Sequence, residues 1–398
     1  MPTSESKRVQ LDSGQRPTWA EIDLDALAAN FHVIKQHVGP GINVMAIVKA
    51  NAYGHGAIAC ARRLAAEGAA WFGVALPEEG IELRESGINQ PILCLGGFWE
   101  GQAAACVKYH LTPVVYRLDM MEELNRAAGA AGAVVEVHLK IDTGMGRLGF
   151  RFDELNDAAA AINRFENLRV DGLMTHFAAA DDPTCEALTE NQIARFASAV
   201  GVFRQAGHQP TFVHSANSAA IYSHPDAWGN MIRPGGLLYG LWRDVLPAKV
   251  DASALHPVMS LHSSISLLKW VPAGETIGYG CTFEASRKTL VATIPIGYDD
   301  GYPRAMSNRA HVVVRGVFAS VVGRISMDLT LVDVTGVPGV ESGDPVILIG
   351  RDGATGHSVT AEELAKISGT LSYEITCGVG SRVPRLIRGV SATPPGAR

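Results

Sequence analysis

From about residue 43 to residue 240, short apolar runs alternate with longer Ala-rich segments in which the apolar residues have helical spacing. This alternation is typical of consecutive β-α units around a parallel sheet. Eight of the runs have the length of buried strands, and eight parallel strands are what closes a (β/α)8 TIM barrel. The predicted strands are residues 43–49, 71–75, 91–95, 112–115, 134–141, 169–175, 211–214 and 231–239.

Several segments between these runs have the length and apolar spacing of helices that cover a barrel. A further helix is predicted at residues 25–38, before the first barrel strand. Asp23 or Asp25 can cap it, because a carboxylate at this position accepts hydrogen bonds from free backbone N–H groups. The other predicted helices are residues 56–67, 78–85, 153–165 and 185–206.

After residue 255 the pattern changes: Val, Ile, Thr and Gly dominate, and alternating runs appear at residues 310–314 and 329–334. Alternation of this kind predicts strands with one buried face, and helical stretches nearly vanish. A chain of 398 residues also exceeds what a single core usually holds. We therefore predict a disordered segment at residues 1–16, a barrel at 17–255 and a mostly-β C-terminal domain at 256–398.

The composition narrows the classes of function. A net charge of −6 gives no basic surface for nucleic acid, and no apolar run has the length of a signal peptide or a membrane span. The six cysteines form no C-x-x-C pair, which argues against structural zinc and a disulfide framework. The expectation is a cytoplasmic protein with a small-molecule substrate and no metal, nucleic-acid partner or membrane partner.

Residues 44–56 contain the most informative motif, Val-Met-Ala-Ile-Val-Lys-Ala-Asn-Ala-Tyr-Gly-His-Gly. A buried strand here ends in Lys49 and passes directly into a glycine-rich turn. Active sites of such barrels lie at the C-terminal ends of the strands, so Lys49 is expected in the catalytic mouth. The segment resembles the lysine motif of the bacterial alanine racemase family, and further matches extend over almost the whole chain.

The resemblance implies a (β/α)8 barrel with a C-terminal β domain, a homodimer with shared active sites, and pyridoxal phosphate joined to Lys49 as a Schiff base. Tyr53 matches a tyrosine that contacts the cofactor phosphate. Tyr279, in Gly-Tyr-Gly at residues 278–280, matches the second catalytic residue, supplied by the neighbouring subunit. Racemisation needs acid-base groups on both faces of the reacting carbon, which Lys49 and Tyr279 would supply. His176 matches the histidine that hydrogen-bonds this tyrosine.

Three cationic residues also match family positions. Arg147 matches the arginine that orients the substrate carboxylate and the cofactor, and Lys140 matches a lysine that is often carbamylated. An ordinary Lys140, ion-paired elsewhere, stays an alternative. Arg233 matches the arginine that faces the pyridine nitrogen. Because a guanidinium with a pKa above about 12 does not donate its proton, the electron sink of the cofactor is weakened.

The remaining matches concern the phosphate and the substrate. Ser218, Gly235 and Gly236 fit phosphate binding after the seventh and eighth strands, although many family members have a larger residue where Gly236 stands. Met327 would contact the substrate carboxylate through its backbone N–H. The segment containing Met327 and Asp328 resembles one that reaches across the dimer interface. Tyr298 and Tyr373 match tyrosines that narrow the access to the substrate. At residue 299 the family commonly has Ala and this chain has Asp.

Together these residues favour alanine racemase chemistry, with D-alanine for peptidoglycan precursors as the usual role in the family. The alternatives are a racemase with a broader substrate range, a pyridoxal-phosphate decarboxylase of the same architecture, and a non-enzymatic pyridoxal-phosphate carrier. The decarboxylases place a carboxylate at the pyridine nitrogen and lack the Tyr279 turn. The broad-range racemases are typically exported, and the carrier proteins lack the β domain.

Overall fold

A computed structural model describes residues 14–389. The chain divides into two compact units: the barrel unit contains residues 23–258, and the β unit contains residues 259–386 together with the strand that ends at the start of the barrel unit. Most of the predicted disordered segment, residues 1–13, lies outside the described residues. Arg16 belongs to that prediction too, but it forms an ion pair with Asp300 of the β unit, so the prediction extends too far at its C-terminal end.

The barrel unit is built on eight parallel strands in the order β10-β2-β3-β4-β5-β6-β8-β9. The backbone N–H of Arg233 donates to the carbonyl of Ala216 at 3.1 Å, which joins the segments after β10 and β9 and nearly closes the ring. The predicted TIM barrel is confirmed. Its strands are β2 (Asn43–Ile47), β3 (Trp71–Val74), β4 (Ile92–Cys94), β5 (Thr112–Val115), β6 (Val135–Asp142), β8 (Leu168–Met174), β9 (Phe212–His214) and β10 (Met231–Ile232).

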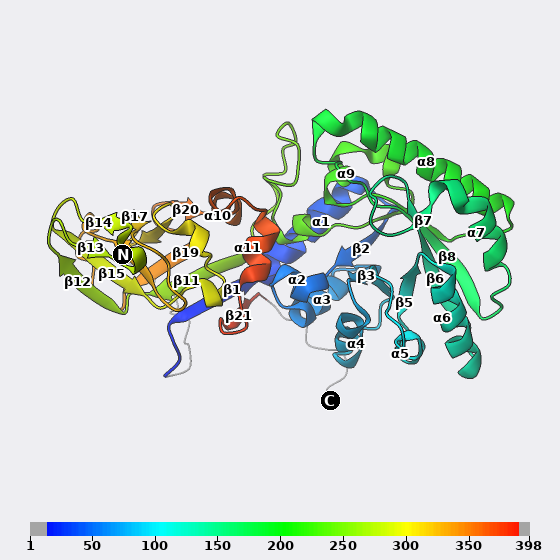
Figure 1. The fold of residues 1–398 in the computed structure, drawn as a ribbon, viewed down its shortest axis with the longest axis horizontal. Helices are drawn as coiled ribbons and strands as arrows, with labels where there is room; N and C mark the ends of the chain where they lie inside the picture. Colours follow the sequence, from blue (N-terminus) through cyan, green and yellow to red (C-terminus); the bar gives the residue numbers. More distant parts are fainter. Residues whose placement is uncertain (1–13, 390–398) are drawn as a thin grey trace. The chain divides into compact units, whose positions relative to one another are not determined.

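Helices cover the outside of the barrel, and their colours run from blue to green in Figure 1. Asp23 caps the first helix: its carboxylate accepts the backbone N–H groups of Asp25 and Ala26, both at 2.9 Å. The helices are α1 (Leu24–Val38), α3 (Ala57–Ala66), α4 (Pro77–Glu85), α5 (Ala103–Lys108), α6 (Leu118–Ala130), α7 (Leu155–Ile162), α8 (Glu186–Gln205) and the short α9 (Ser218–Ser223).

Two predicted strands are too long. The first was predicted to include Lys49, but β2 ends at Ile47 and Lys49 begins a tight turn. The eighth was predicted at residues 231–239, but β10 ends at Ile232 and residues 236–239 form a 3-10 turn. Pro234 has no N–H for a strand ladder, and Gly235 adopts a backbone conformation outside the strand region, with φ −113° and ψ −97°. Apolar character continues past both strand ends because these turns are buried.

The β unit contains a ten-stranded sheet in the order β12-β15-β18-β17-β16-β19-β11-β1-β21, with β20 beside β19. Strand β1 (Thr18–Asp23) pairs with β11, and the rings of Trp19 and His262 stack at 5.4 Å. Residues 17–22 therefore belong to this sheet rather than to the barrel, which corrects the predicted boundary. The other strands are β11 (Met259–Ser264), β12 (Leu267–Val271), β15 (Thr289–Ile294), β16 (His311–Val314), β17 (Val317–Val321), β18 (Thr330–Asp333), β19 (Pro345–Arg351), β20 (Ser358–Val359) and β21 (Arg385–Arg388).

The β unit also contains two helices, α10 (Ala361–Ser368) and α11 (Ser372–Gly378), where the sequence pattern predicted almost none. A capping box marks the start of α10: Thr360 Oγ1 accepts from the Glu363 N–H at 3.1 Å, and the Glu363 carboxylate accepts from the Thr360 N–H at 2.9 Å. Tyr373 lies on α11. Within residues 14–389, the helices are all too short or too polar to cross a membrane.

Candidate active site

Lys49 stands at the C-terminal end of β2, at the start of a strained turn. The four residues that follow, 50–53, have φ between 53° and 54°, which is the left-handed region. Ordinary residues adopt this conformation at a cost of roughly 1–2 kcal/mol each, so the fold must hold the turn in place. Strain of this kind is concentrated at functional sites.

The carboxylate of Glu79, on α4, holds this turn. It accepts the N–H of Ala50 at 2.6 Å and the N–H of Ala75 at 2.6 Å, and so joins the ends of β2 and β3. On the other side of the turn, the Asn51 side chain accepts the N–H of Ala57 at 2.7 Å. Glu79 was not identified from the sequence, where it reads as an ordinary acidic residue in the first turn of a helix.

Tyr53, Ser218 and Gly235 form a small polar cradle in the barrel unit. The Gly235 N–H donates to the Ser218 hydroxyl at 3.0 Å. A Cβ at residue 235 would collide with the hydroxyl of Tyr53, so only glycine leaves this space open. Gly236 lies beside the cradle and is buried at the start of the 3-10 turn. Hydroxyls and backbone N–H groups in this arrangement suit a phosphate group.

The Arg233 guanidinium is buried and surrounded by neutral acceptors. It donates to the carbonyls of Thr175 and Ser215 at 2.8 and 2.9 Å, and to Nδ1 of His214 at 2.9 Å. His176 Nδ1 lies 3.4 Å away. Burial lowers the pKa of Arg233 to about 9, so the group is still protonated at neutral pH. It is a fixed cation that donates hydrogen bonds.

Two further histidines continue from Arg233 into the barrel core. His214 accepts from Arg233 through Nδ1, so its proton lies on Nε2, which is 2.9 Å from Nδ1 of His138. Burial lowers the pKa of His138 to about 3 and that of His214 well below its ordinary value, so both are neutral. Neutral histidines leave Arg233 as the cation of this chain of hydrogen bonds. The sequence analysis missed both residues, which stand in apolar strands.

Lys140 and His176 each lie within electrostatic reach of Arg147, Arg233 and Lys49. The pKa of Lys140 is lowered to about 8, chiefly by burial and then by the cations Arg147, Arg233 and Lys49. The pKa of His176 lies well below its ordinary value, again through burial first and then through the same group of cations. His176 is therefore neutral and accepts from Arg233 through Nδ1, which leaves its Nε2 as an N–H donor.

The predicted site residues of the β unit are placed differently. Tyr279 begins a short 3-10 turn after Gly278, and 70% of its surface is exposed. Tyr298 and Met327 are 42% and 50% exposed. Asp328 accepts from Arg382 at 2.7 Å. These side chains point out of their own unit, whereas those of the barrel unit converge.

Two family models together match most of the chain. Residues 22–242 match the family model described as "Alanine racemase, N-terminal domain", and residues 258–387 match "Alanine racemase, C-terminal domain". The chain is 45% identical over 375 residues to the alanine racemase of Geobacter sulfurreducens, with 93% of this chain and 97% of that one covered.

Solved structures give the same result. The alanine racemase of a D-cycloserine-producing Streptomyces lavendulae has a TM-score of 0.88 at 37% identity, over 95% of this chain and 98% of that one. The alanine racemase of Bartonella henselae, solved with covalently bound pyridoxal phosphate, has a TM-score of 0.84 at 29% identity, over 94% and 99% of the two chains.

Proposed function

The chain belongs to the alanine racemase family, and on this premise we propose that it interconverts L-alanine and D-alanine with pyridoxal 5'-phosphate. The observation that carries the proposal is the arrangement of the barrel mouth, where Lys49 follows a strand end and where Lys49 and the buried Arg233 both lie within electrostatic reach of Lys140. Supply of D-alanine for peptidoglycan precursors is the role we propose for the reaction.

The residues of the barrel mouth fit the cofactor. Gly235, Ser218 and Tyr53 leave open a cradle that a Cβ would fill, and they offer the donors that a phosphate needs. Arg233 would face the pyridine nitrogen. Since its neighbours are neutral acceptors, it keeps its proton and donates only a hydrogen bond to that nitrogen. Lys49 would hold the cofactor covalently.

Bound pyridoxal phosphate supplies an electron sink that acidifies the Cα–H bond of an amino acid joined to it. The protein must then remove a proton from one face of Cα and return one to the other. Lys49, as a free amine, would be the acid-base group on one face. Lys49 and Lys140 lie within electrostatic reach of each other, which places the proposed acid-base group next to the buried lysine of the barrel mouth.

Tyr279 of the partner subunit is the acid-base group that we propose for the opposite face. A tyrosine needs hydrogen-bond donors to work as a base, because its ordinary pKa is about 10. Neutral His176, with its Nε2–H free of Arg233, is such a donor. The 70% exposure of Tyr279 in its own unit agrees with a role in a site completed by a second copy of the chain, and we propose a homodimer.

Lys140 and Arg147 would position the substrate carboxylate. At a pKa of about 8, about a tenth of Lys140 is the free amine at pH 7, far more than for an ordinary lysine, and the free amine is the form that reacts with carbon dioxide to give a carbamate. The carbamate is an anion and would hold the Arg147 guanidinium. Tyr298 and Tyr373 would limit the size of the side chain that reaches the site, and Met327 would contact the substrate carboxylate through its backbone N–H.

The decisive experiment incubates the purified protein, loaded with pyridoxal phosphate, with L-alanine in heavy water. Chirality and Cα deuterium are followed together by chiral chromatography and mass spectrometry. Deuterated D-alanine that approaches equal amounts of the two enantiomers supports the proposal. If L-alanine returns unlabelled, alanine is not the substrate, and larger amino acids and release of carbon dioxide are tested next.

A further inference from the structure

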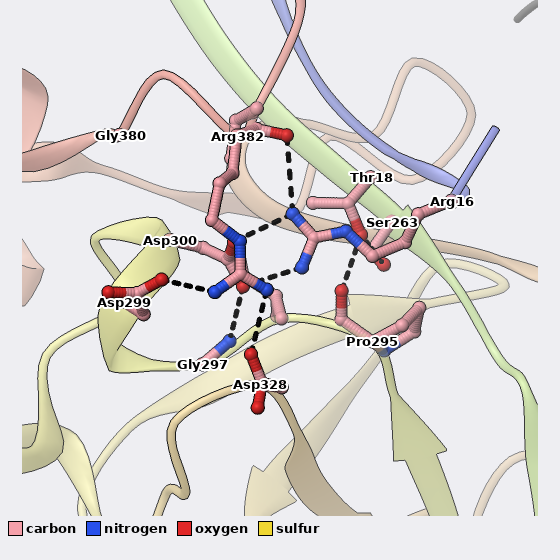
Figure 2. Close-up of polar contacts among 12 residues, drawn as sticks. Arg16, Thr18, Ser263, Pro295, Gly297, Asp299, Asp300, Asp328, Gly380 and Arg382 are labelled. Atoms are coloured by element: carbon pink, nitrogen blue, oxygen red, sulfur yellow. Dashed lines mark hydrogen bonds and ion pairs between the residues drawn. The ribbon is translucent and has the colours of Figure 1, made fainter.

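Figure 2 shows a cluster of two arginines and three aspartates in the β unit, and two of the aspartates directly follow the predicted substrate-facing residues Tyr298 and Met327 in the sequence. The Arg382 guanidinium stands at its centre. It forms an ion pair with Asp299, donates to Asp328 at 2.7 Å and lies 3.4 Å from Asp300. One side chain thus connects three carboxylates from two different loops.

Asp300, at the end of the 3-10 turn formed by Tyr298–Asp300, is the buried part of this cluster. Its side chain is fully buried and accepts two hydrogen bonds from Arg16, at 2.8 and 2.6 Å. It also accepts the N–H of Gly297 at 3.0 Å, and Arg16 donates to the carbonyl of Arg382 at 3.3 Å. A bidentate arginine–carboxylate pair is strong and directional. Arg16 therefore holds the Asp300 side chain in one orientation, in which it faces Arg382.

The two loops that Arg382 connects also touch through their backbones. The N–H of Tyr298 donates to the carbonyl of Ser326 at 3.0 Å, and that of Asp299 donates to the carbonyl of Met327 at 3.2 Å. A Cβ at Gly297 would collide with the Met327 carbonyl, so the loops approach as closely as a glycine allows. Asp299 directly follows Tyr298, and Asp328 directly follows Met327. Because Arg382 binds both Asp299 and Asp328, it also fixes the distance between the residues that precede them, Tyr298 and Met327.

We propose that Arg382 is a positioning residue that holds Tyr298 and Met327 at a fixed spacing by joining Asp299 to Asp328, and that it thereby limits the size of the accepted amino acid. The inference rests on the proposed function, because it takes Tyr298 and Met327 as the residues that meet the substrate. Asp299 adds a second anchor to Arg382 where related chains commonly have Ala. In this chain, Arg382 is therefore bound both to the loop that contains Tyr298 and to the loop that contains Met327.

Charge gives Arg382 a second effect at the same place. Asp299 and Asp328 are both exposed, with 50% and 55% of their side-chain surfaces accessible. Without the arginine, two unbalanced carboxylates would stand beside Tyr298 and Met327. Because the substrate carries a carboxylate of its own, its binding would weaken through repulsion.

The contribution of the cluster to stability is expected to be small. The ion pairs of Arg382 with Asp299 and Asp328 are exposed, and the buried Asp300 keeps its two hydrogen bonds from Arg16 without Arg382, so little free energy of unfolding depends on Arg382. A positioning role and a purely structural role therefore predict different results. Positioning changes KM and the choice of substrate, whereas a structural role changes the melting temperature and lowers every activity in the same proportion.

The test compares Arg382→Met, Arg382→Lys and the wild type, all loaded with pyridoxal phosphate. We expect Arg382→Met to raise KM for L-alanine roughly fivefold with kcat changed less than about twofold, and to raise the rate on L-serine relative to L-alanine. Arg382→Lys should recover only part of the effect, because an ammonium does not bridge two carboxylates as a fork. Asp299→Ala, which leaves Arg382 bound to Asp328, should give a smaller change in the same direction.

Arg287→Met is the matched control, because it removes an exposed arginine 3.0 Å from Asp333 in the same unit. It should leave KM, the serine-to-alanine ratio and the melting temperature unchanged. Unchanged KM and ratio in Arg382→Met would overturn the inference, and so would a fall in melting temperature with a proportional loss on both substrates. A wild type without Cα exchange on alanine would refute the proposed function itself, which the heavy-water experiment measures separately.

Discussion

The two units prepare the same predicted site in opposite ways. In the barrel unit, Arg233 is 4% exposed and Lys140 is 5% exposed, and Arg233 donates to a buried set of acceptors. In the β unit, the candidate catalytic side chain, Tyr279, is mostly exposed, and exposed ion pairs bind the aspartates that follow Tyr298 and Met327. One unit encloses its functional groups and the other presents them.

This difference indicates a division of labour. Burial in the barrel mouth shifts the pKa values of Lys140 and His176 within a single chain. An exposed tyrosine lacks such an environment in its own unit and needs another surface to supply it. Changes in the barrel unit should therefore act on the cofactor, and changes in the β unit should act on proton delivery and substrate choice.

Lys49→Ala should produce the largest effect, because it removes both the cofactor linkage and one acid-base group. Racemase activity is expected to fall by a factor on the order of 10⁴ or more. Borohydride reduction followed by peptide mass spectrometry should find the cofactor mass on Lys49 in the wild type and no labelled lysine in the variant. A label on a different lysine of the wild type would contradict the assignment.

Tyr279→Phe tests the β unit and should have the next largest effect. Loss of a positioned acid-base group typically lowers the rate by about 10²–10⁴-fold. Because the barrel mouth is intact, the absorbance of the bound cofactor should match that of the wild type. Exchange of the Cα proton should persist for one enantiomer only. Racemisation in both directions at the wild-type rate would refute the two-base assignment.

Mixing the two variants sharpens the comparison between units. In a dimer of one Lys49→Ala chain and one Tyr279→Phe chain, one of the two shared sites keeps both the wild-type lysine and the wild-type tyrosine. After denaturation and refolding of an equal mixture, half of the dimers are mixed, and about a quarter of the wild-type activity should return. If the activity stays at the level of the separate variants, the site is built within one chain.

Gly235→Ala tests the phosphate cradle, with a smaller expected effect. The new methyl group would collide with the Tyr53 hydroxyl, and overpacking of this kind costs about 1–3 kcal/mol. Cofactor affinity, measured by absorbance titration, should fall on the order of tenfold to a hundredfold. Adding Tyr53→Phe removes the colliding oxygen and should restore part of the affinity. Gly201→Ala on α8, where a methyl group meets open space, is the control and should bind the cofactor normally.

Much of the fold could be predicted because β-α alternation is a local pattern. The apolar run at 112–115 coincides with β5, and Asp23 caps α1 as one of the two expected candidates. Strand β1 could not be assigned in this way, because its partner β11 lies more than 200 residues away in the sequence. The end of β10 was missed because buried turns are as apolar as buried strands.

The candidate site residues came from motifs, and their roles are still predictions. The residues that the sequence did not reveal share one property: they act on other protein groups. His214 and Glu79 hold Arg233 and the Lys49 turn, and no spacing rule marks such contacts. Asp299 was noticed as a departure from the family pattern without an explanation. Its ion pair with Arg382, which is 83 residues away, supplies one.

Lys140→Met should have the smallest effect and tests the burial of the barrel mouth through stability. In the folded protein the pKa of Lys140 is about 8, and in the unfolded chain it is about 10.4, so the unfolded chain binds more protons between these values. The free energy of unfolding of the wild type should therefore rise with pH in this window relative to the variant, by about 1 kcal/mol between pH 7 and pH 9. Urea denaturation in buffers free of carbon dioxide measures this difference in the free energy of unfolding. Lys249→Met, which removes an exposed lysine, is the control and should follow the wild type. If the free energy of unfolding changed with pH in the same way for the wild type and Lys140→Met, Lys140 would not be held as a buried amine. The contrast between an enclosed barrel unit and an exposed β unit would then lack its main electrostatic evidence.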